Sequence, residues 1–369
     1  MHIKKINIKN FRCFKDFYIS FDAPITIISG NNGTGKTSIL EAMHYLCYMK
    51  SFRTASPKEL VNFDLVDIDN FFIKASFQTQ DCENNELQIG FSQNKRLVKL
   101  NKKNVSSFKD LMDFYRTVTL TEDDLFFIKG GPEVRREFLD HAILLLDHTF
   151  LNKIKEFKKI LQNRNILLQN GNFNKDLYDL WTEQLWEKSI IIQKMRSKLI
   201  KEYETVINNI LIDIFSGEIG QLDDSVSVSL EYKIKKVDLH GDFDSFIAGN
   251  ADLMAQELCF KRSLFGAHLD DFLIKFQSKK SKNYASRGQQ KMVVLMLKIA
   301  QLIDLKKKRG AAVFLLDDFM TDFDEKRAEI LIKFLISLKI QLIFTAPTEG
   351  GFFEDLLVRM GASKVKLTA

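Results

Sequence analysis

The sequence predicts an α/β fold with three features: a parallel sheet covered by helices, an antiparallel β meander, and an inserted, mostly helical lobe. From residue 288 to the end, apolar strand patterns alternate with amphipathic helix patterns, which is typical of a parallel sheet. Within residues 1–100, strand patterns of period two surround one helix and indicate antiparallel pairing. Between these regions the apolar period is mainly helical, so a helical segment interrupts the chain.

The N-terminal part begins with strands. Apolar and polar residues alternate over 6–8 and 17–21, and the apolar run 25–28 predicts a buried strand ending at Gly30. A helix is expected over 37–48. Three further strands, the last two joined by a polar turn at 92–95, are expected over 71–77, 87–91 and 96–100. These three strands predict the antiparallel β meander.

The middle of the chain is mostly helical. Pro132 follows two glycines and is well placed as a first helical residue, and the apolar face that continues to Leu161 extends this pattern. A second long helix is expected over 177–214, so the two predict an antiparallel helical pair. The sequence then predicts a strand over 226–234, a helix over 243–260 and a strand over 272–276.

The C-terminal part alternates between helices and strands. Helices are expected over 288–305, 324–338 and 351–358, and strands over 312–316 and 341–344. The whole pattern predicts three parts: an N-terminal part over 1–130, an inserted, mostly helical lobe over 131–261 and a C-terminal part over 262–369.

Composition excludes several classes of protein. Hydrophobic residues at 45% and charged residues at 28% exclude collagen-like and fully disordered chains. A net charge of +6, from 54 basic and 48 acidic residues, permits a nucleic-acid partner without demanding one. The four cysteines form no C-x-x-C pair, which argues against a zinc hook and for reduced thiols in a cytoplasm: Cys13, Cys47, Cys82 and Cys259. No signal peptide, membrane span or membrane partner is expected.

A phosphate-binding loop lies between the predicted strand 25–28 and the helix after it. The segment fits G-x-x-x-x-G-K-[ST], and the residues expected to bind ATP are Gly30, Asn31, Asn32, Gly33, Thr34, Gly35, Lys36, Thr37 and Ser38. The glycines let backbone N–H groups surround a phosphate, Lys36 reaches the β- and γ-phosphates, and the Thr37 hydroxyl can bind Mg²⁺. The alternative is a chance Gly/Asn turn before a helix.

Two acids end the apolar strand at 312–316. Asp317 is expected to hold Mg²⁺, and Asp318 is expected to act in catalysis by orienting or deprotonating the attacking water. An acidic pair at the start of a helix is the alternative interpretation. Most of the chain separates the two acids from Lys36, which excludes a compact nucleotide kinase or small GTPase and indicates an insertion.

A second anion site is predicted at the start of the helix over 288–305. Ser286, Gly288 and Gln289 stand in a segment that resembles the signature motif of ABC-type ATPases. A Ser hydroxyl and a Gly N–H at a helix N-terminus suit a phosphate. In that superfamily the motif contacts the ATP bound by a partner subunit. The resemblance therefore implies an ABC-type P-loop ATPase head that forms an ATP-dependent homodimer.

The chain as a whole resembles the RecF family of SMC/Rad50-like ATPases. The resemblance extends from residue 10 to about 345, and its matching segments include 10–12, 51–54, 122–125, 129–140, 162–165, 266–271 and 315–318. It implies a D-loop with Asp322 and Asp324. It also implies a DNA-repair ATPase with Mg²⁺ that clamps gapped DNA or single-strand/duplex junctions and promotes RecA loading with RecO- and RecR-type mediator proteins. Slow, DNA-stimulated ATP hydrolysis would reset it.

Four arginines in these segments are candidates for contacts with DNA or nucleotide phosphate: Arg12, Arg53, Arg135 and Arg136. Each could equally be a solvated or ion-paired residue. His268 stands beside Asp270 and Asp271, but no second His or Cys at ligand spacing accompanies it, so an anchoring role is favoured over a metal site.

Three other kinds of ATPase remain as alternatives. A transporter ATPase subunit is disfavoured by the long helical insert, and a fused nuclease by the few residues that follow the predicted head. A full SMC or Rad50 protein would need a long coiled coil with a hinge or hook, which this sequence lacks.

Overall fold

The computed structural model describes residues 1–65, 69–79, 81–105, 111, 114–170, 174–215, 227–235, 241–310, 312–318, 323–346 and 351–368. The chain divides into two compact units. Unit 1 consists of Met1–Asp124 and Leu295–Ala369, and unit 2 consists of Leu125–Val294. Each unit is described by itself.

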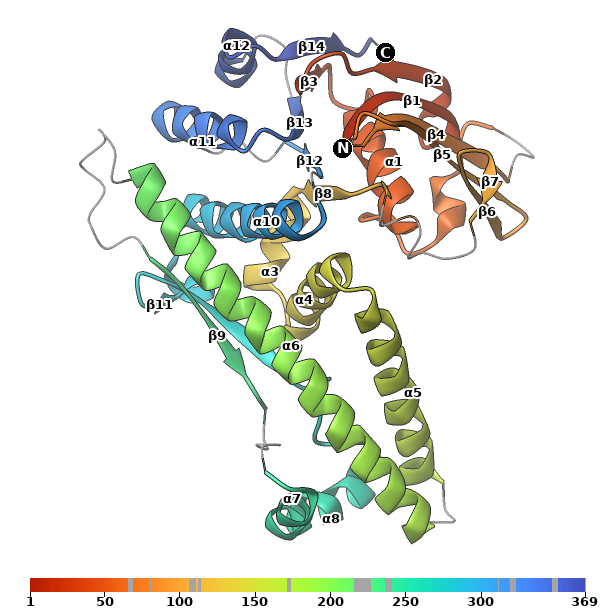
Figure 1. Cartoon of the computed structure of the whole chain (residues 1–369), viewed down its shortest axis with the longest axis vertical. Coiled ribbons are helices and arrows are strands. Elements are labelled where there is room, and N and C mark those ends of the chain that lie inside the picture. Colours follow the sequence, from red (N-terminus) through yellow and green to blue (C-terminus); the bar gives the residue numbers. More distant parts are fainter. Residues whose placement is uncertain are drawn as a thin grey trace. The chain divides into compact units, whose positions relative to one another are not determined.

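Unit 1 contains a parallel sheet of five strands in the order β14-β3-β13-β12-β8 (Figure 1). The strands are β3 (Ile25–Ser29), β8 (Thr117–Leu120), β12 (Val313–Leu316), β13 (Gln341–Ala346) and β14 (Ser363–Lys366). Every residue of the middle strands β3, β12 and β13 is buried. Continuous apolar runs such as Val313–Leu316 suit strands that are covered on both faces.

The second sheet of unit 1 is antiparallel, in the order β2-β1-β4-β5-β6-β7. Its strands are β1 (His2–Phe11), β2 (Phe14–Ser20), β4 (Phe71–Gln78), β5 (Asn84–Ser92), β6 (Lys95–Leu100) and β7 (Lys103–Asn104). Buried and less buried residues alternate along β4, so one face of this sheet is covered. Helix α1 (Lys36–Tyr48) contacts strands of both sheets, and one apolar core joins them.

The remaining helices of unit 1 alternate with the parallel strands β12, β13 and β14 in sequence. They are α11 (Glu325–Ser337), α12 (Phe352–Arg359) and the larger part of α10 (Arg287–Arg309), whose first turns belong to unit 2. Two short 3-10 helices, Pro57–Leu60 and Glu122–Leu125, lie in connections. The alternation of helix and parallel strand confirms the predicted α/β class.

Unit 2 is mostly helical. Its helices are α3 (Phe126–Lys129), α4 (Pro132–Leu146), α5 (Thr149–Gln169), α6 (Lys175–Phe215), α7 (Phe243–Gly249), α8 (Ala251–Phe260) and α9 (Ser281–Tyr284). Helices α5 and α6 pack antiparallel, since Glu156 pairs with Lys188 and Arg164 with Thr182. A three-stranded antiparallel sheet, β11-β10-β9, contacts α4 and α6; its strands are β9 (Val228–Lys233), β10 (Asp271–Phe276) and β11 (Lys279–Lys280).

Two helix predictions need correction. The pattern after Pro132 gives two helices, because α4 ends at Leu146 and α5 begins at Thr149. The helix expected over 243–260 is broken between Gly249 and Ala251, where Asn250 leaves the helical conformation. Strands β8 and β14 were not expected. Residue 226 of the strand predicted over 226–234 lies outside the described residues.

Two further expectations agree with the fold. All four cysteines are unbridged. In the part of the chain that the structure describes, every helix is too short or too polar to span a bilayer. The division into 1–130, 131–261 and 262–369 stays a proposal beside the two observed units.

Candidate functional site: a phosphate loop and two acids

The phosphate loop connects β3 to α1, as its sequence predicts. Gly33 and Gly35 have φ angles of 87° and 95°, a region that L side chains rarely adopt. A Cβ atom on Gly35 would also come within 2.6 Å of the Cys13 sulfur. Glycine is therefore required at Gly35 both by its φ angle and by the close approach of the neighbouring loop.

The loop is closed on itself by Lys36. Its ammonium group donates to the backbone oxygens of Gly30 at 2.7 Å and Asn31 at 3.0 Å. The Thr34 hydroxyl donates to the same Asn31 oxygen at 2.9 Å. A phosphate entering the loop would therefore exchange these carbonyl contacts of Lys36 for its own oxygens.

The two acids lie at the carboxyl end of β12, within reach of the loop. The Thr37 hydroxyl donates to Asp317 Oδ1 at 3.0 Å. On the neighbouring strand β13, Thr345 Oγ1 lies 2.9 Å from Oδ1 of both Asp317 and Asp318. Thr345 Oγ1 also accepts the Asp318 backbone N–H at 2.9 Å. Residues distant in the sequence therefore meet at one edge of the parallel sheet.

The acid pair suits a divalent cation. Burial raises the pKa of Asp317 to about 6; the Thr345 hydrogen bond opposes this rise, and the Asp318 charge adds to it. Two carboxylates beside a Thr hydroxyl are hard oxygen ligands of the kind that Mg²⁺ takes together with nucleotide phosphates. Thr37 and Asp317 therefore fit the predicted Mg²⁺ role, while Asp318 faces the same space.

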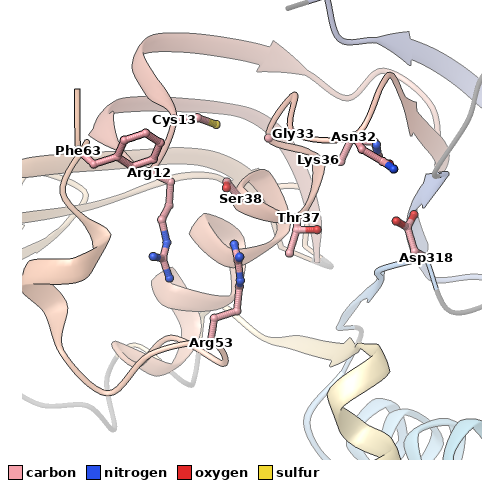
Figure 2. A pocket seen from close by; sticks show the side chains of 11 residues that line it. Arg12, Cys13, Asn32, Gly33, Lys36, Thr37, Ser38, Arg53, Phe63 and Asp318 are labelled. Atoms are coloured by element: carbon pink, nitrogen blue, oxygen red, sulfur yellow. The ribbon is translucent and has the colours of Figure 1, made fainter. Parts of the chain in front are cut away.

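A cavity of about 320 Å³ lies along the loop, lined by Arg12, Cys13, Asn32, Gly33, Gly35, Lys36, Thr37, Ser38, Arg53, Phe63 and Asp318. Figure 2 shows Asp318 and Thr37 toward one end, and Phe63 with Arg12 and Cys13 at the other. Seven of these residues were predicted to bind nucleotide, cation or water, and two more, Arg12 and Arg53, to contact DNA or nucleotide phosphate. Cys13 and Phe63 were assigned no role from the sequence.

Glu41 is a further site residue to which no role was assigned from the sequence. It is fully buried on α1, and its carboxylate accepts two hydrogen bonds from Arg12, at 2.6 and 2.9 Å. It also accepts the Ser51 hydroxyl at 2.5 Å and pairs with Arg53 at 3.7 Å. A buried charge needs partners. The available sequence signal for this role was therefore an acidic residue within the predicted helix over 37–48, in a chain whose candidate phosphate contacts include Arg12 and Arg53.

Arg135 and Arg136 have internal contacts in unit 2. Arg135 is 8% exposed, donates to both oxygens of Asp271 at 2.7 and 2.9 Å, and donates to the carbonyls of Phe127 and Gly130. Arg136 donates to the Asp270 backbone oxygen at 2.7 Å. These contacts agree with the ion-paired alternative for Arg135, and a contact of either arginine with DNA or phosphate stays a prediction.

The signature segment caps α10. Ser286 Oγ accepts the Gln289 N–H at 3.3 Å, and Gln289 Oε1 accepts the Ser286 N–H at 2.8 Å, which is a capping box. Gly288 follows in the first turn. Of the two D-loop residues, Asp322 lies outside the described residues, and Asp324 caps α11 by accepting the Arg327 N–H at 3.0 Å.

Comparison with known proteins identifies the chain. The family model described as the RecF/RecN/SMC N terminal domain matches residues 2–364. The chain belongs to this family. RecF relatives are similar along nearly the full length: the DNA replication and repair protein RecF of Geotalea daltonii is 31% identical over 94% of this chain and 93% of its own, and that of Prosthecochloris aestuarii is 29% identical over 98% and 99%.

Solved structures agree with this RecF assignment. A structure described as the recombination mediator protein RecF with ATP in the RecFOR pathway has a TM-score of 0.81 at 26% identity, covering 95% of this chain and 92% of that one. An Smc head bound to a domain of ScpA matches with a TM-score of 0.52 at 14% identity, which shows the shared head fold alone. The predicted ABC-type head is thereby confirmed.

Proposed function

We propose that the chain is an ATP-dependent DNA-binding protein of recombinational repair. The Thr37–Asp317 hydrogen bond of 3.0 Å carries this proposal, because it joins the phosphate loop to the acid pair in one nucleotide site. RecF relatives named for DNA replication and repair, and a RecF structure described with ATP, support the cellular role.

The residues divide the chemistry of ATP hydrolysis among them. Loop N–H groups and Lys36 hold the β- and γ-phosphates once Lys36 has left the carbonyls of Gly30 and Asn31. Thr37 and Asp317 would hold Mg²⁺, which supplies neutralising charge when bound. Asp318 orients or deprotonates the attacking water.

Dimerisation would complete the site. Ser286, Gly288 and Gln289 of one copy would contact the γ-phosphate held by the other, since the capped start of α10 presents a helix N-terminus suited to an anion. Asp322 and Asp324 would act near this contact as the D-loop. ATP then joins two copies, and slow, DNA-stimulated hydrolysis separates them.

DNA and mediator partners complete the proposal. The preferred DNA would be a gapped duplex or a single-strand/duplex junction, and RecO- and RecR-type proteins would act with the dimer to promote RecA loading. Of the candidate arginines, Arg53 is the best suited to contact DNA, because its side chain is 45% exposed even though it pairs with Glu41. Both arginines line the nucleotide cavity, but Arg12 is held more tightly by its two hydrogen bonds to Glu41.

Light scattering tests the proposal with the full chain, ATP and a gapped duplex. We expect a dimer with ATP and Mg²⁺, and stronger DNA binding than without nucleotide.

Lys36→Ala should abolish nucleotide binding and, with it, the dimer, because the ammonium contact to the phosphates is lost. Lys36→Ala protein that still binds ATP with wild-type affinity would reject the phosphate-loop assignment.

A further inference from the structure

The nucleotide cavity has a second end whose chemistry differs from that of the phosphate end. Lys36, Thr37 and Asp318 hold phosphate and cation, while Arg12, Cys13 and Phe63 line the far end (Figure 2). A triphosphate fixed by the loop directs the covalently attached ribose and base along the remaining cavity. A nucleotide bound in this direction would place its base at the far end.

The Phe63 side chain is exposed at the far end of the cavity, and the backbone that carries it is held by hydrogen bonds. Its side chain is 77% exposed, the largest fraction among the exposed large hydrophobic residues of the described chain. Asn62 beside it is 2% exposed and donates its N–H to the Asn10 oxygen at 2.9 Å. The Asn62 side chain also accepts the Asp64 N–H at 2.9 Å. The chain on both sides of the ring is thus held in place.

The polar neighbours at this end are committed to other contacts. Arg12 donates through Nε and Nη2 to Glu41 and through Nη1 to the Glu59 oxygen at 2.9 Å. Its backbone N–H donates to the Leu60 oxygen at 2.8 Å, which ties it to the segment that carries Phe63. Burial raises the pKa of the Cys13 thiol, so it is neutral and adds no charge near a base.

We propose that the Phe63 ring is a stacking platform for the nucleotide base, so that the far end of the cavity recognises a flat aromatic ring through its face. The proposal rests on the proposed function of the same site, because it assumes that the loop holds a triphosphate. Base–aromatic stacking needs an accessible π-face and no matched pattern of donors, and Phe63 offers such a face.

Isothermal titration of the full chain with Mg²⁺ and either ATP or inorganic triphosphate tests the proposal. Phe63→Ala should raise the Kd for ATP by about fivefold or more and leave the Kd for triphosphate unchanged, because only the base loses its contact. Phe63→Trp should retain ATP binding, and its added fluorescence should be quenched by ATP and not by triphosphate. Tyr18→Ala is the matched control, since Tyr18 is an exposed aromatic residue of unit 1 outside the cavity lining.

Two results would overturn the platform. One is an unchanged Kd for ATP in Phe63→Ala; the other is an equal loss of ATP and triphosphate binding, which would mean that the ring shapes the loop. If the wild-type chain bound neither ATP nor triphosphate, the proposed function itself would be overturned. The two failures are therefore distinguishable.

Discussion

His268 shows how one side chain in unit 2 depends on burial. Burial, together with the charges of Arg136, Arg164 and Arg196, lowers the pKa of His268 to about 4, against a hydrogen bond to the Ser263 backbone. Its ring lies 6.1 Å from that of Phe157, and its Nδ1 atom is buried. A neutral, packed ring agrees with the anchoring role favoured from the sequence.

Acid should therefore destabilise unit 2 through His268. The unfolded chain binds a proton near pH 6.5, whereas the folded chain resists it down to about pH 4. Stability is thus highest above pH 6.5 and is lost as the pH falls, by up to about 2 kcal/mol at pH 5. Urea unfolding at pH 7 and pH 5 measures this, followed by the fluorescence of Trp181 and Trp186, which both lie on α6.

His268→Gln should flatten the pH dependence. His141→Gln is the matched control, since the His141 side chain is 45% exposed on α4. An identical pH dependence in the wild type and His268→Gln would show that other groups control the acid response.

Single residues also show what the sequence could and could not predict. Lys36, Thr37 and Asp317 were predictable, because a loop of fixed spacing and a strand ending in acids identify themselves locally. Thr345 was not, because its contact with both acids depends on β13 pairing with β12. The Asp271 partner of Arg135 was not predictable for the same reason, since Asp271 is distant in sequence.

At the scale of elements, the start of α10 combines two roles in the same residues. Ser286 and Gln289 form the capping box that the helix needs, and the proposed trans contact would use the Ser286 hydroxyl as well. A substitution that removes the cap would change both the stability of the helix and dimerisation, so the two effects could not be separated. A useful variant must keep the helix cap and lose the trans contact.

Ser286→Asp provides that separation. Aspartate caps helices about as well as serine, so the free energy of unfolding should stay within about 0.5 kcal/mol of the wild type. A carboxylate facing a γ-phosphate would repel it, so ATP-induced dimerisation should be lost while monomer ATP binding remains. Thermal melting, ATP titration and light scattering measure the three quantities. A normal dimer in Ser286→Asp would reject the trans contact, and Ser286→Asn, a neutral cap, is the control.

Element boundaries were predictable where the apolar pattern was long. The helix over 37–48 and the strand over 341–344 match α1 and β13 closely. The break at Asn250 and the strand β14 were missed, because one non-helical residue hardly changes an apolar period and Ser363–Lys366 is short and mostly polar. Its pairing with β3, which makes it a strand, is a tertiary contact.

At the scale of the whole molecule, the proposed cycle depends on Asp318 acting after ATP has joined two copies. Asp318→Asn should keep ATP binding, lower the turnover rate by about 10²–10⁴-fold and prolong the dimer, because proton transfer from the water is lost. Phosphate release and the decay of light scattering after ATP dilution measure these effects. Asp16→Asn, an exposed acid on β2, is the control; unchanged turnover in Asp318→Asn would exclude Asp318 as the base.

An insertion was predictable because most of the sequence separates Lys36 from Asp317, and unit 1 indeed consists of two chain segments. The boundary inside α10 was not, since a continuous helical pattern carries no sign of which unit each turn joins. The net charge said little about the site, because +6 belongs to the whole chain, whereas Arg12 and Arg53 are already paired with Glu41.

Glu41 couples two loops thermodynamically. Arg12 follows β1 and Arg53 follows α1, yet both depend on this one carboxylate, which is 0% exposed. When either arginine is removed, Glu41 keeps the other as its partner. In a double-mutant cycle, the free-energy cost of removing both arginines should therefore differ from the sum of the two single costs by about 0.5–3 kcal/mol. Signals between nucleotide at Arg12 and any ligand at Arg53 would then pass through a single buried anion.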